Sequence, residues 1–543
     1  MKKSLSFASI AAIATPAMVL AAAPDAAREA RVDAVFAAYG PSVPGCAVGV
    51  EQDGRTLFAR GYGVADLEAK RPLTPASSVY MASVSKQVAA MAVLLLVEDG
   101  KLRLDDRARS IIPELPAYAD QVTVRQLLTH NSGLRDFFTL GGISGYADDR
   151  PYSEKDVLDL LGRQQGLDFE PDTDHLYSNS GYVALSLIVQ RVSGQRLDDF
   201  ARARIFNPLG MTKTRFQHDH TQPVPDKANG YVKAGEGWKL SNSYLDVVGD
   251  GGLYSTTGDM LRWIANMDGG KVGAPSVALM RESARLKDGT PTGYGMGLAP
   301  GSYRGLPLVQ HGGGLAGYRT MTYWFPTEKL GIVISCNNGE ASSGALASKV
   351  ADIYLDGKLK PQTVLSDVAP DEAARPLAGV YRDKGGMYFE LALNDGKLAT
   401  VRPPWSLAQL SPGVFALPTD PDGVRFRFDA DGKGFSLASE GGRARRFERV
   451  EKQATTGAEA AAYVGSYQSP EVPAPITIRQ DGGLKLKIGE LPELPLFQTA
   501  PDRLWAPDAG LELLFIRDAA GTADKLLLNA GRARGLKYAR TGS

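Results

Sequence analysis

The last third of the chain repeats itself, and this duplication constrains the fold more than any other feature. The tripeptide Gly-Val-Tyr at 379–381 recurs 86 residues later as Gly-Ser-Tyr at 465–467. The tetrapeptide Gly-Arg-Ala-Arg at 442–445 recurs 89 residues later at 531–534. Short alternating runs broken by Gly, Pro and Asp surround these repeats and are typical of β-strands. We therefore predict two small antiparallel β-barrels of about eighty residues each.

The part of the chain before the repeats alternates strand and helix signals. Residues 45–52 and 56–63 are predicted to be two strands joined by an Asp-Gly turn. The middle of this region is helical, and strand signals return near its end. Strands from both ends of such a region can pair in one antiparallel sheet flanked by helices, with a helical subdomain beside it. We predict that the functional residues meet at the seam between sheet and subdomain.

These patterns predict an α+β fold followed by two small antiparallel β-barrels. A chain of 543 residues is too long for one ordinary core. The predicted domains are 23–360 for the α+β unit, 371–452 for the first barrel and 458–543 for the second.

Composition and charge describe a globular protein. The chain is 43% hydrophobic and 22% charged, with 61 basic and 61 acidic residues. This balance indicates neither a basic surface for nucleic acid nor a disordered acidic tail. We expect no nucleic-acid partner, and a homodimer stays open as an assembly.

Residues 1–22 are predicted to be a secretory signal peptide. Lys2 and Lys3 precede an apolar stretch over 8–22 that ends in small residues. The stretch is short and alanine-rich for a membrane span, and no cysteine follows it to carry a lipid. The alternative is a buried N-terminal helix. We expect a periplasmic or secreted protein with no integral membrane segment after signal removal.

The sequence contains two cysteines, Cys46 and Cys336, both in strand-like runs. They could pair in an exported protein, but single buried thiols are common in sheets, which favours unpaired thiols and leaves pairing open. His218 and His220 have metal-like spacing, yet no third or fourth ligand is evident. We expect no metal and no cofactor.

Ser83 and Lys86 form an S-x-x-K motif where a helix is predicted to begin. Residues three apart on a helix share one face. A serine hydroxyl becomes a nucleophile when a neighbour takes its proton, and a nearby lysine can do so when burial or positive charge favours its neutral form. The alternative is an ordinary first turn with a capping serine and a solvated lysine. The motif alone is weak, and its interpretation depends on two later segments.

The two later segments are Tyr177-Ser178-Asn179, before another helical pattern, and a His-Gly-Gly-Gly run from His311 to Gly314 on a predicted strand. A serine and lysine early, a tyrosine and asparagine in the middle, and a basic residue with glycines late form the ordered signature of serine acyl-transfer enzymes that recognise penicillins. The chain resembles the class C β-lactamase and D-stereospecific peptidase branch. Supporting matches lie at 127–134, 205–211 and 251–256.

The chemistry predicts a role for each residue. Ser83 attacks a carbonyl to form an acyl-enzyme, and the backbone N–H groups of Ser83 and Gly314 form the oxyanion hole. Lys86 and Tyr177 share the proton transfers, and which of them takes the serine proton stays open. Asn179 holds Lys86 or binds a substrate amide.

His311 stands where β-lactamases and carboxypeptidases usually have a lysine. A lysine would bind a substrate carboxylate, whereas a histidine is mostly neutral near pH 7. The residue argues against a strict requirement for a free C-terminus and favours an aminopeptidase, amidase or esterase. The alternative is a strand residue without that role.

The whole architecture is similar to that of bacterial D-aminopeptidases, which carry two barrels after a β-lactamase-like domain. In that family a loop of the last barrel reaches the active site and helps to read the substrate's free amine. The corresponding segment here, 505–510, is shorter, although Asp508 could still supply the carboxylate.

We therefore predict a secreted serine hydrolase that removes N-terminal D-residues from small peptides or amides. Alternatives of the same fold are a broad-specificity esterase, a DD-carboxypeptidase and a β-lactamase. An alternative of another class is a non-catalytic penicillin-binding sensor. His130 and His175 are interpreted as structural residues.

Overall fold

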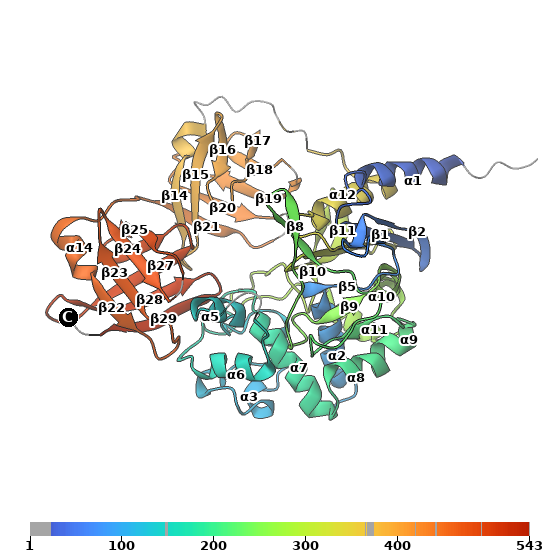
Figure 1. Ribbon diagram of the computed structural model, residues 1–543, viewed down its shortest axis with the longest axis horizontal. Coiled ribbons are helices and arrows are strands. Elements are labelled where there is room, and N and C mark those ends of the chain that lie inside the picture. Colours follow the sequence, from blue (N-terminus) through green and yellow to red (C-terminus); the bar gives the residue numbers. More distant parts are fainter. Residues whose placement is uncertain are drawn as a thin grey trace, which may run out of the picture.

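The computed structural model describes residues 23–146, 150–363, 365, 374–418, 420–439, 442–489 and 491–541. The predicted signal peptide, 1–22, and the start of the predicted first barrel, 371–373, lie outside this set. Figure 1 shows a unit of helices and sheet, coloured blue to yellow, followed by two β units coloured yellow-orange to red. No helix in the described ranges has the length and apolar character needed to cross a membrane.

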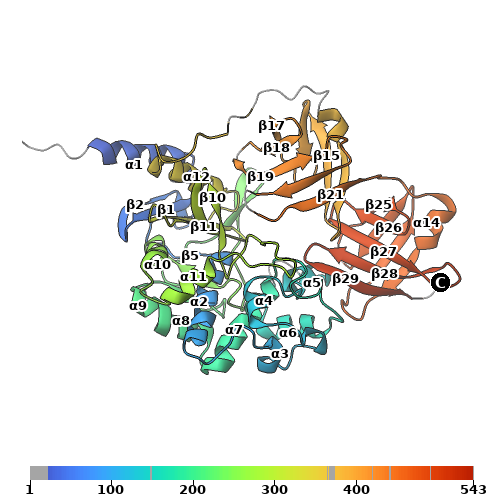
Figure 2. The same cartoon turned by 180° about the vertical axis from the view of Figure 1, so that it is seen from behind.

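A six-stranded antiparallel sheet forms the centre of the first unit, in the order β10-β11-β12-β13-β1-β2. Ile332 and Ile334 pack in one core with two helices, α1 and α12, that lie side by side in Figures 1 and 2. Val333 belongs to the core on the opposite face, with α10. The strands and helices of these layers are β1 (Cys46–Gln52), β2 (Arg55–Tyr62), β10 (Ala299–Tyr303), β11 (Leu306–Leu315), β12 (Tyr318–Phe325), β13 (Leu330–Cys336), α1 (Ala23–Val35), α10 (Thr257–Gly269) and α12 (Ser343–Tyr354).

The hairpin between β1 and β2 occurs where the Asp-Gly signal predicts it. Asp53 and Gly54 have φ angles of 50° and 75°, and a two-residue hairpin turn favours such left-handed conformations. The turn therefore sets the register of the first two strands.

A helical subdomain packs beside the sheet. Its central helix, α2 (Ser85–Glu98), is buried on almost every side, which explains why its sequence is apolar without a clear helical period. Helix α7 (Asn179–Ser193) packs against it and ends at Gly194, whose φ is 74°. The remaining elements of the first unit are β3 (Val64–Asp66), β4 (Arg71–Pro72), β5 (Val79–Tyr80), η1 (Ala82–Val84), α3 (Ala108–Ile111), η2 (Ala117–Ala119), α4 (Val124–Leu128), α5 (Phe137–Ile143), α6 (Glu154–Gly162), α8 (Leu197–Ala201), η3 (Arg202–Phe206), α9 (Asn207–Leu209), β6 (Arg215–Phe216), β7 (Tyr231–Ala234), β8 (Gly237–Leu240), β9 (Leu253–Ser255) and α11 (Ala274–Met280).

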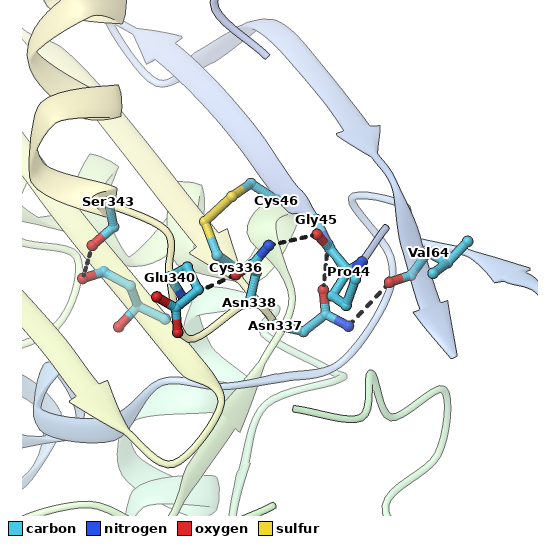
Figure 3. Close-up of a disulfide and its surroundings, with 10 residues drawn as sticks. Pro44, Gly45, Cys46, Val64, Cys336, Asn337, Asn338, Glu340 and Ser343 are labelled. Atoms are coloured by element: carbon cyan, nitrogen blue, oxygen red, sulfur yellow. Dashed lines mark hydrogen bonds between the residues drawn. A yellow bond between two sulfur atoms is a disulfide. The ribbon is translucent and has the colours of Figure 1, made fainter. Parts of the chain in front are cut away.

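Cys46 and Cys336 form a disulfide (Figure 3), so the expectation of unpaired thiols is wrong. The two residues face each other in the β1–β13 register, with their Cα atoms 3.9 Å apart. Residues 290 apart in sequence reach this position because β1 and β13 are neighbours in the sheet. Asn337 supports the same corner: its Oδ1 accepts from the Gly45 N–H at 2.9 Å.

The two C-terminal units are antiparallel, barrel-like sheets of eight strands each, as the duplication predicts. The sheet of the first β unit has the strand order β16-β15-β14-β21-β20-β19-β18-β17, and a bridge between Ala399 and Ser406 links its two ends. The second unit, β22 to β29, is a closed barrel. Their elements are η4 (Arg375–Leu377), β14 (Gly379–Asp383), β15 (Tyr388–Asn394), β16 (Lys397–Thr400), β17 (Ala408–Ser411), β18 (Val414–Leu417), β19 (Asp420–Phe428), β20 (Gly434–Ala438), β21 (Arg445–Val450), α14 (Gly457–Tyr463), β22 (Gly465–Gln468), β23 (Ile476–Gln480), β24 (Leu484–Ile488), β25 (Leu494–Ala500), β26 (Arg503–Ala506), β27 (Leu511–Arg517), β28 (Ala523–Ala530) and β29 (Ala533–Arg540).

The repeated tyrosines make the same contact in both units. The Tyr381 hydroxyl donates to the Leu377 carbonyl and the Tyr467 hydroxyl to the Tyr463 carbonyl, each at 2.9 Å. Each tyrosine is fully buried. The repeat in sequence is therefore a repeat in structure.

The closed barrel docks on the helical subdomain through a buried ion pair. Nη1 of Arg135 lies 2.6 Å from Oε1 of Glu471, and both side chains are almost fully buried. The same guanidinium donates to the Arg534 carbonyl at 2.7 Å. In Figures 1 and 2, β29 consequently lies beside α5, which begins two residues after Arg135.

Candidate active site

The Ser83 hydroxyl and the Lys86 amine lie together at the start of α2. Ser83 is in the short turn η1, and Lys86 is in the first turn of α2. The distance from Nζ of Lys86 to Oγ of Ser83 is 3.3 Å. Ala82, just before the serine, has a φ of 47°, which non-glycine residues rarely adopt. The backbone is thus bent sharply where the serine is presented.

Lys86 is fully buried and donates to two further oxygens. Nζ lies 2.8 Å from Oδ1 of Asn179 and 2.7 Å from the Asp250 carbonyl. An ammonium has three N–H donors, and these three oxygens account for all of them. The amine is therefore held in one position beside the serine.

Asp136 orients Asn179. Its Oδ2 accepts from both the backbone N–H and the side-chain Nδ2 of Asn179, at 2.7 and 2.8 Å. This arrangement leaves Oδ1 of Asn179 as the atom that faces Lys86. Asp136 also caps α5 by accepting from the Thr139 N–H at 3.2 Å. Sequence reasoning missed Asp136, although an aspartate just before an apolar run is a recognisable cap signal.

Tyr177 lies beside the lysine through its ring. Nζ of Lys86 is 4.8 Å from the centre of the Tyr177 ring. The Tyr177 hydroxyl oxygen is buried and has no hydrogen-bond partner among the described residues. Its ring packs on that of His130, with ring centres 4.1 Å apart. The phenol is therefore placed at the site with its hydroxyl free to bond to another group.

His130 supports this arrangement as a structural residue. Its Nδ1 accepts from the Ser178 backbone N–H at 3.1 Å, and burial keeps the pKa of His130 well below its ordinary value. His175 lies at the edge of the same aromatic group, and burial lowers its pKa to about 4. Both imidazoles are therefore neutral at pH 7.

His311 is neutral as well. Burial, and then the charge of Lys86, lowers the pKa of His311 to about 4. Its Nδ1 is 2.7 Å from the Gly312 carbonyl, so Nδ1 carries the proton, and Nε2 accepts from the Tyr294 hydroxyl at 2.9 Å. His311 thus lines the site as a neutral, hydrogen-bonded ring.

The glycines after His311 differ in what they permit. A Cβ on Gly313 would lie 2.3 Å from the Met81 carbonyl, so only glycine lets β11 pack against the turn that carries Ser83. A Cβ on Gly314 would meet nothing closer than 3.6 Å. Gly314 lines the active-site cavity, where its backbone N–H remains the predicted oxyanion donor.

Five of the six predicted site residues, Ser83, Tyr177, Asn179, His311 and Gly314, line one cavity of about 590 Å³, whereas Lys86 does not line it. Asp250 also lines it, and Oδ1 of Asp250 has no hydrogen-bond partner among the described residues. Burial raises the pKa of Asp250 to about 6, against the opposing charge of Lys86. The cavity is lined by Tyr80, Ala82, Ser83, Asp136, Phe138, Thr139, Tyr177, Asn179, Leu245, Asp250, Gly251, His311, Gly312, Gly314, Leu315 and Arg532.

The closed barrel reaches this cavity through Arg532, and the expectation about Asp508 is wrong. Asp508 forms an ion pair with Arg402 at 2.7 Å and does not line the cavity. Arg532, in the turn between β28 and β29, lines it instead. The segment that contains Asp508 belongs to a different hairpin of the barrel, which packs toward the first β unit.

The metal-like spacing of His218 and His220 leads to two separate contacts. His218 lies 3.3 Å from Asp198, whereas His220 lies 2.9 Å from Asp246. Asp219, His220 and Asp246 could place ligand atoms near one another, but they are half-buried at the surface of the subdomain. None of these three residues lines the cavity that contains Ser83.

Comparison with known proteins agrees with this geometry. Residues 32–354 match the Beta-lactamase family model. The chain is 28% identical to a D-aminopeptidase of Cereibacter sphaeroides, over 92% of this chain and 96% of that protein. It is 31% identical to penicillin-binding protein 4* of Bacillus subtilis, over 64% of this chain and 80% of that protein. The octameric penicillin-binding protein homologue from Pyrococcus abyssi has a similar fold, with a TM-score of 0.56 at 23% identity over 78% of this chain and 99% of that chain.

The family match covers more than half of the chain, which therefore belongs to the beta-lactamase family. The protein is a serine hydrolase of that family. Its similarity to D-aminopeptidases extends beyond the catalytic unit through both β units.

Proposed function

We propose that the protein is an exported D-aminopeptidase that removes N-terminal D-residues from small peptides or amides through an acyl-enzyme on Ser83. The observation that carries the proposal is the contact between Ser83 and a buried Lys86, which Asn179 holds in place at the cavity. Similarity to D-aminopeptidases over almost the full chain supports the substrate class.

Lys86 takes the serine proton in this mechanism. Its Nζ lies within reach of the Ser83 hydroxyl, whereas the Tyr177 hydroxyl has no hydrogen bond to either group. With Lys86 in its neutral form, which still donates to Asn179 and Asp250, Nζ accepts the Ser83 proton as the serine oxygen attacks the carbonyl, and the backbone N–H groups of Ser83 and Gly314 bind the oxyanion. The phenol of Tyr177 then protonates the leaving nitrogen and regains a proton from the Lys86 ammonium, and water later cleaves the acyl-enzyme.

Asp250 supplies the negative charge for the substrate's ammonium. Among the described residues two carboxylates line the cavity, and the oxygens of Asp136 are already engaged by Asn179 and Thr139. Asp250 retains an unpaired oxygen. With a pKa of about 6, Asp250 is largely ionised at pH 7 and can pair with an ammonium.

Export is supported by two features. Residues 1–22 have the pattern of a secretory signal peptide. The Cys46–Cys336 disulfide suits an oxidising compartment, such as the periplasm or the medium.

The first experiment measures hydrolysis of D-alanine p-nitroanilide, a neutral aryl ester, a D-Ala-D-Ala peptide and a chromogenic cephalosporin. We expect the anilide to be cleaved, and Ser83→Ala to lower kcat at least about a thousandfold. Cleavage of the ester alone would contradict the aminopeptidase assignment. A permanent adduct with penicillin in mass spectra, without turnover of any substrate, would instead identify a sensor.

The second experiment tests Asp250. Asp250→Asn should raise KM for the anilide about tenfold or more and change KM for the amine-free ester far less. In the wild type, the ratio of kcat/KM for anilide over ester should fall as the pH drops below about 6, because the protonated Asp250 no longer attracts an ammonium. A ratio that does not change with pH or with the substitution would remove Asp250 from amine recognition.

A further inference from the structure

Arg532 is a cationic residue of the closed barrel that lines the catalytic cavity. Among the described residues that line the cavity, it is the one arginine, and no lysine lines it. Its guanidinium carbon lies 5.0 Å from the centre of the Tyr177 ring. The side chain is 45% exposed, so it is accessible from the cavity.

The backbone of Arg532 is anchored by hydrogen bonds, whereas its guanidinium forms a long ion pair with Asp136 and lies over the Tyr177 ring. The Arg532 carbonyl accepts from the Asp136 N–H at 3.0 Å. Two residues later, the Arg534 N–H donates to Oδ1 of Asp168 at 2.6 Å, and its carbonyl accepts from Arg135. The turn is therefore held on both sides, and Arg532 is presented from a rigid support.

Within the described part of the chain, the Arg532 guanidinium donates no hydrogen bond. Its closest carboxylate oxygen, Oδ2 of Asp136, is 3.9 Å away, beyond hydrogen-bond distance, and already accepts two bonds from Asn179. A guanidinium with a planar set of free N–H donors matches the two oxygens of a carboxylate.

The position of Arg532 indicates which part of the substrate it meets. The Arg532 guanidinium lies over the ring of Tyr177, the group that we propose protonates the leaving nitrogen. A substrate carboxylate near Arg532 therefore belongs to the leaving portion. His311, which stands where related enzymes carry a lysine, is neutral and cannot supply this charge.

We propose that Arg532 binds a carboxylate on the leaving group, so that the preferred substrates are dipeptides with a free C-terminus and an N-terminal D-residue. This inference rests on hydrolysis at Ser83 as proposed above. It assigns the two ends of a zwitterionic dipeptide to opposite charges, the ammonium to Asp250 and the carboxylate to Arg532. A cavity of about 590 Å³ is large enough for a ligand of this size.

The decisive experiment compares two esters that differ in one charge, 3-acetoxybenzoate and 3-acetoxybenzamide. In both, Ser83 forms a bond to the acetyl carbon, the phenol leaves with a proton, and water regenerates the serine. Arg532→Gln should lower kcat/KM for the benzoate at least about tenfold more than for the benzamide, because a charge-assisted bond is lost for the benzoate alone. Arg532→Lys should restore part of the difference.

Arg443→Gln is the matched control, since Arg443 occupies the same place in the repeated tetrapeptide and does not line the cavity. It should leave the ratio between the two esters at the wild-type value. Equal losses for both esters in Arg532→Gln would mean that Arg532 acts through Tyr177 or through folding, and would overturn the proposal. No loss for either ester in Arg532→Gln would overturn it as well.

The peptide pair D-alanylglycine and D-alanylglycinamide separates this inference from the proposed function. We expect the wild type to prefer the free dipeptide and Arg532→Gln to lose that preference. If the wild type cleaves the esters and neither peptide, the D-aminopeptidase function fails, while the ester ratio still decides whether Arg532 binds a carboxylate.

Discussion

The two Gly-Arg-Ala-Arg hairpins have the same sequence but contact different parts of the molecule. In the first β unit, Arg443 forms an ion pair with Asp174 and Arg445 with Asp383. In the closed barrel, Arg534 reaches the same Asp174 at 3.2 Å, and Arg532 enters the active-site cavity. Both hairpins therefore contact Asp174 of the catalytic unit, but Arg532 of the closed barrel lines the cavity and Arg443 of the first β unit does not.

The difference arises from docking rather than from local structure. Each tetrapeptide lies in a hairpin between the last two strands of its unit. The closed barrel is held against the helical subdomain by Glu471, which also accepts from the Gln165 and Lys537 N–H groups at 2.7 and 2.6 Å. Two copies of one segment therefore lie in different surroundings because a separate interface places the closed barrel.

The largest expected effect concerns that interface. Glu471→Gln should lower the free energy of unfolding by about 3–5 kcal/mol, because it leaves the buried charge of Arg135 without its partner. Asp429 forms an exposed ion pair with Arg446 in the first β unit, so Asp429→Asn should lower the free energy of unfolding by less than about 1 kcal/mol. Urea denaturation of both variants measures the difference. Equal costs would mean that docking does not depend on Glu471.

The carboxylate shared by the two hairpins gives the next effect. Burial raises the pKa of Asp174, but the bonds from Arg443 and the His175 N–H outweigh burial and hold the pKa below its ordinary value of 3.8. Asp174 therefore stabilises the fold above about pH 4, and this contribution is lost as the pH falls through the lowered pKa. Asp174→Asn should cost about 2 kcal/mol at pH 7.

The cost of Asp174→Asn should shrink below pH 4, where the wild type loses the same charge. Thermal melts of both proteins between pH 3 and 7 follow this change. A cost that stays constant over the whole range would show that the charge of Asp174 does not link the hairpins to the catalytic unit.

The smallest effect is expected at Asp508. It is exposed, pairs with Arg402 and lies outside the cavity, so Asp508→Asn should leave kcat/KM for D-alanine p-nitroanilide near the wild-type value. Its effect on stability should stay under about 1 kcal/mol. A tenfold rise in KM would instead place this loop in amine recognition, as in the D-aminopeptidase family that the sequence resembles.

Sequence reasoning located the serine, lysine and asparagine because each motif is short and adjoins a strong helix signal. The glycine run after His311 was also identifiable, although its main steric requirement is at Gly313, next to the turn that carries the serine. Asp250 and Tyr294 were missed because their roles depend on which side chains surround them. No local pattern encodes that neighbourhood.

By itself the sequence determined the α+β unit, the duplicated β units and the order of the predicted catalytic motifs. Periodicity, turn residues and repeat spacing act over a few residues, so they can be read along the chain. The tertiary structure alone decided that Cys46 meets Cys336, that Asp136 orients Asn179 and that Arg532 rather than Asp508 enters the cavity. These contacts join residues tens to hundreds of positions apart, and their geometry depends on strand register and on how the barrel docks.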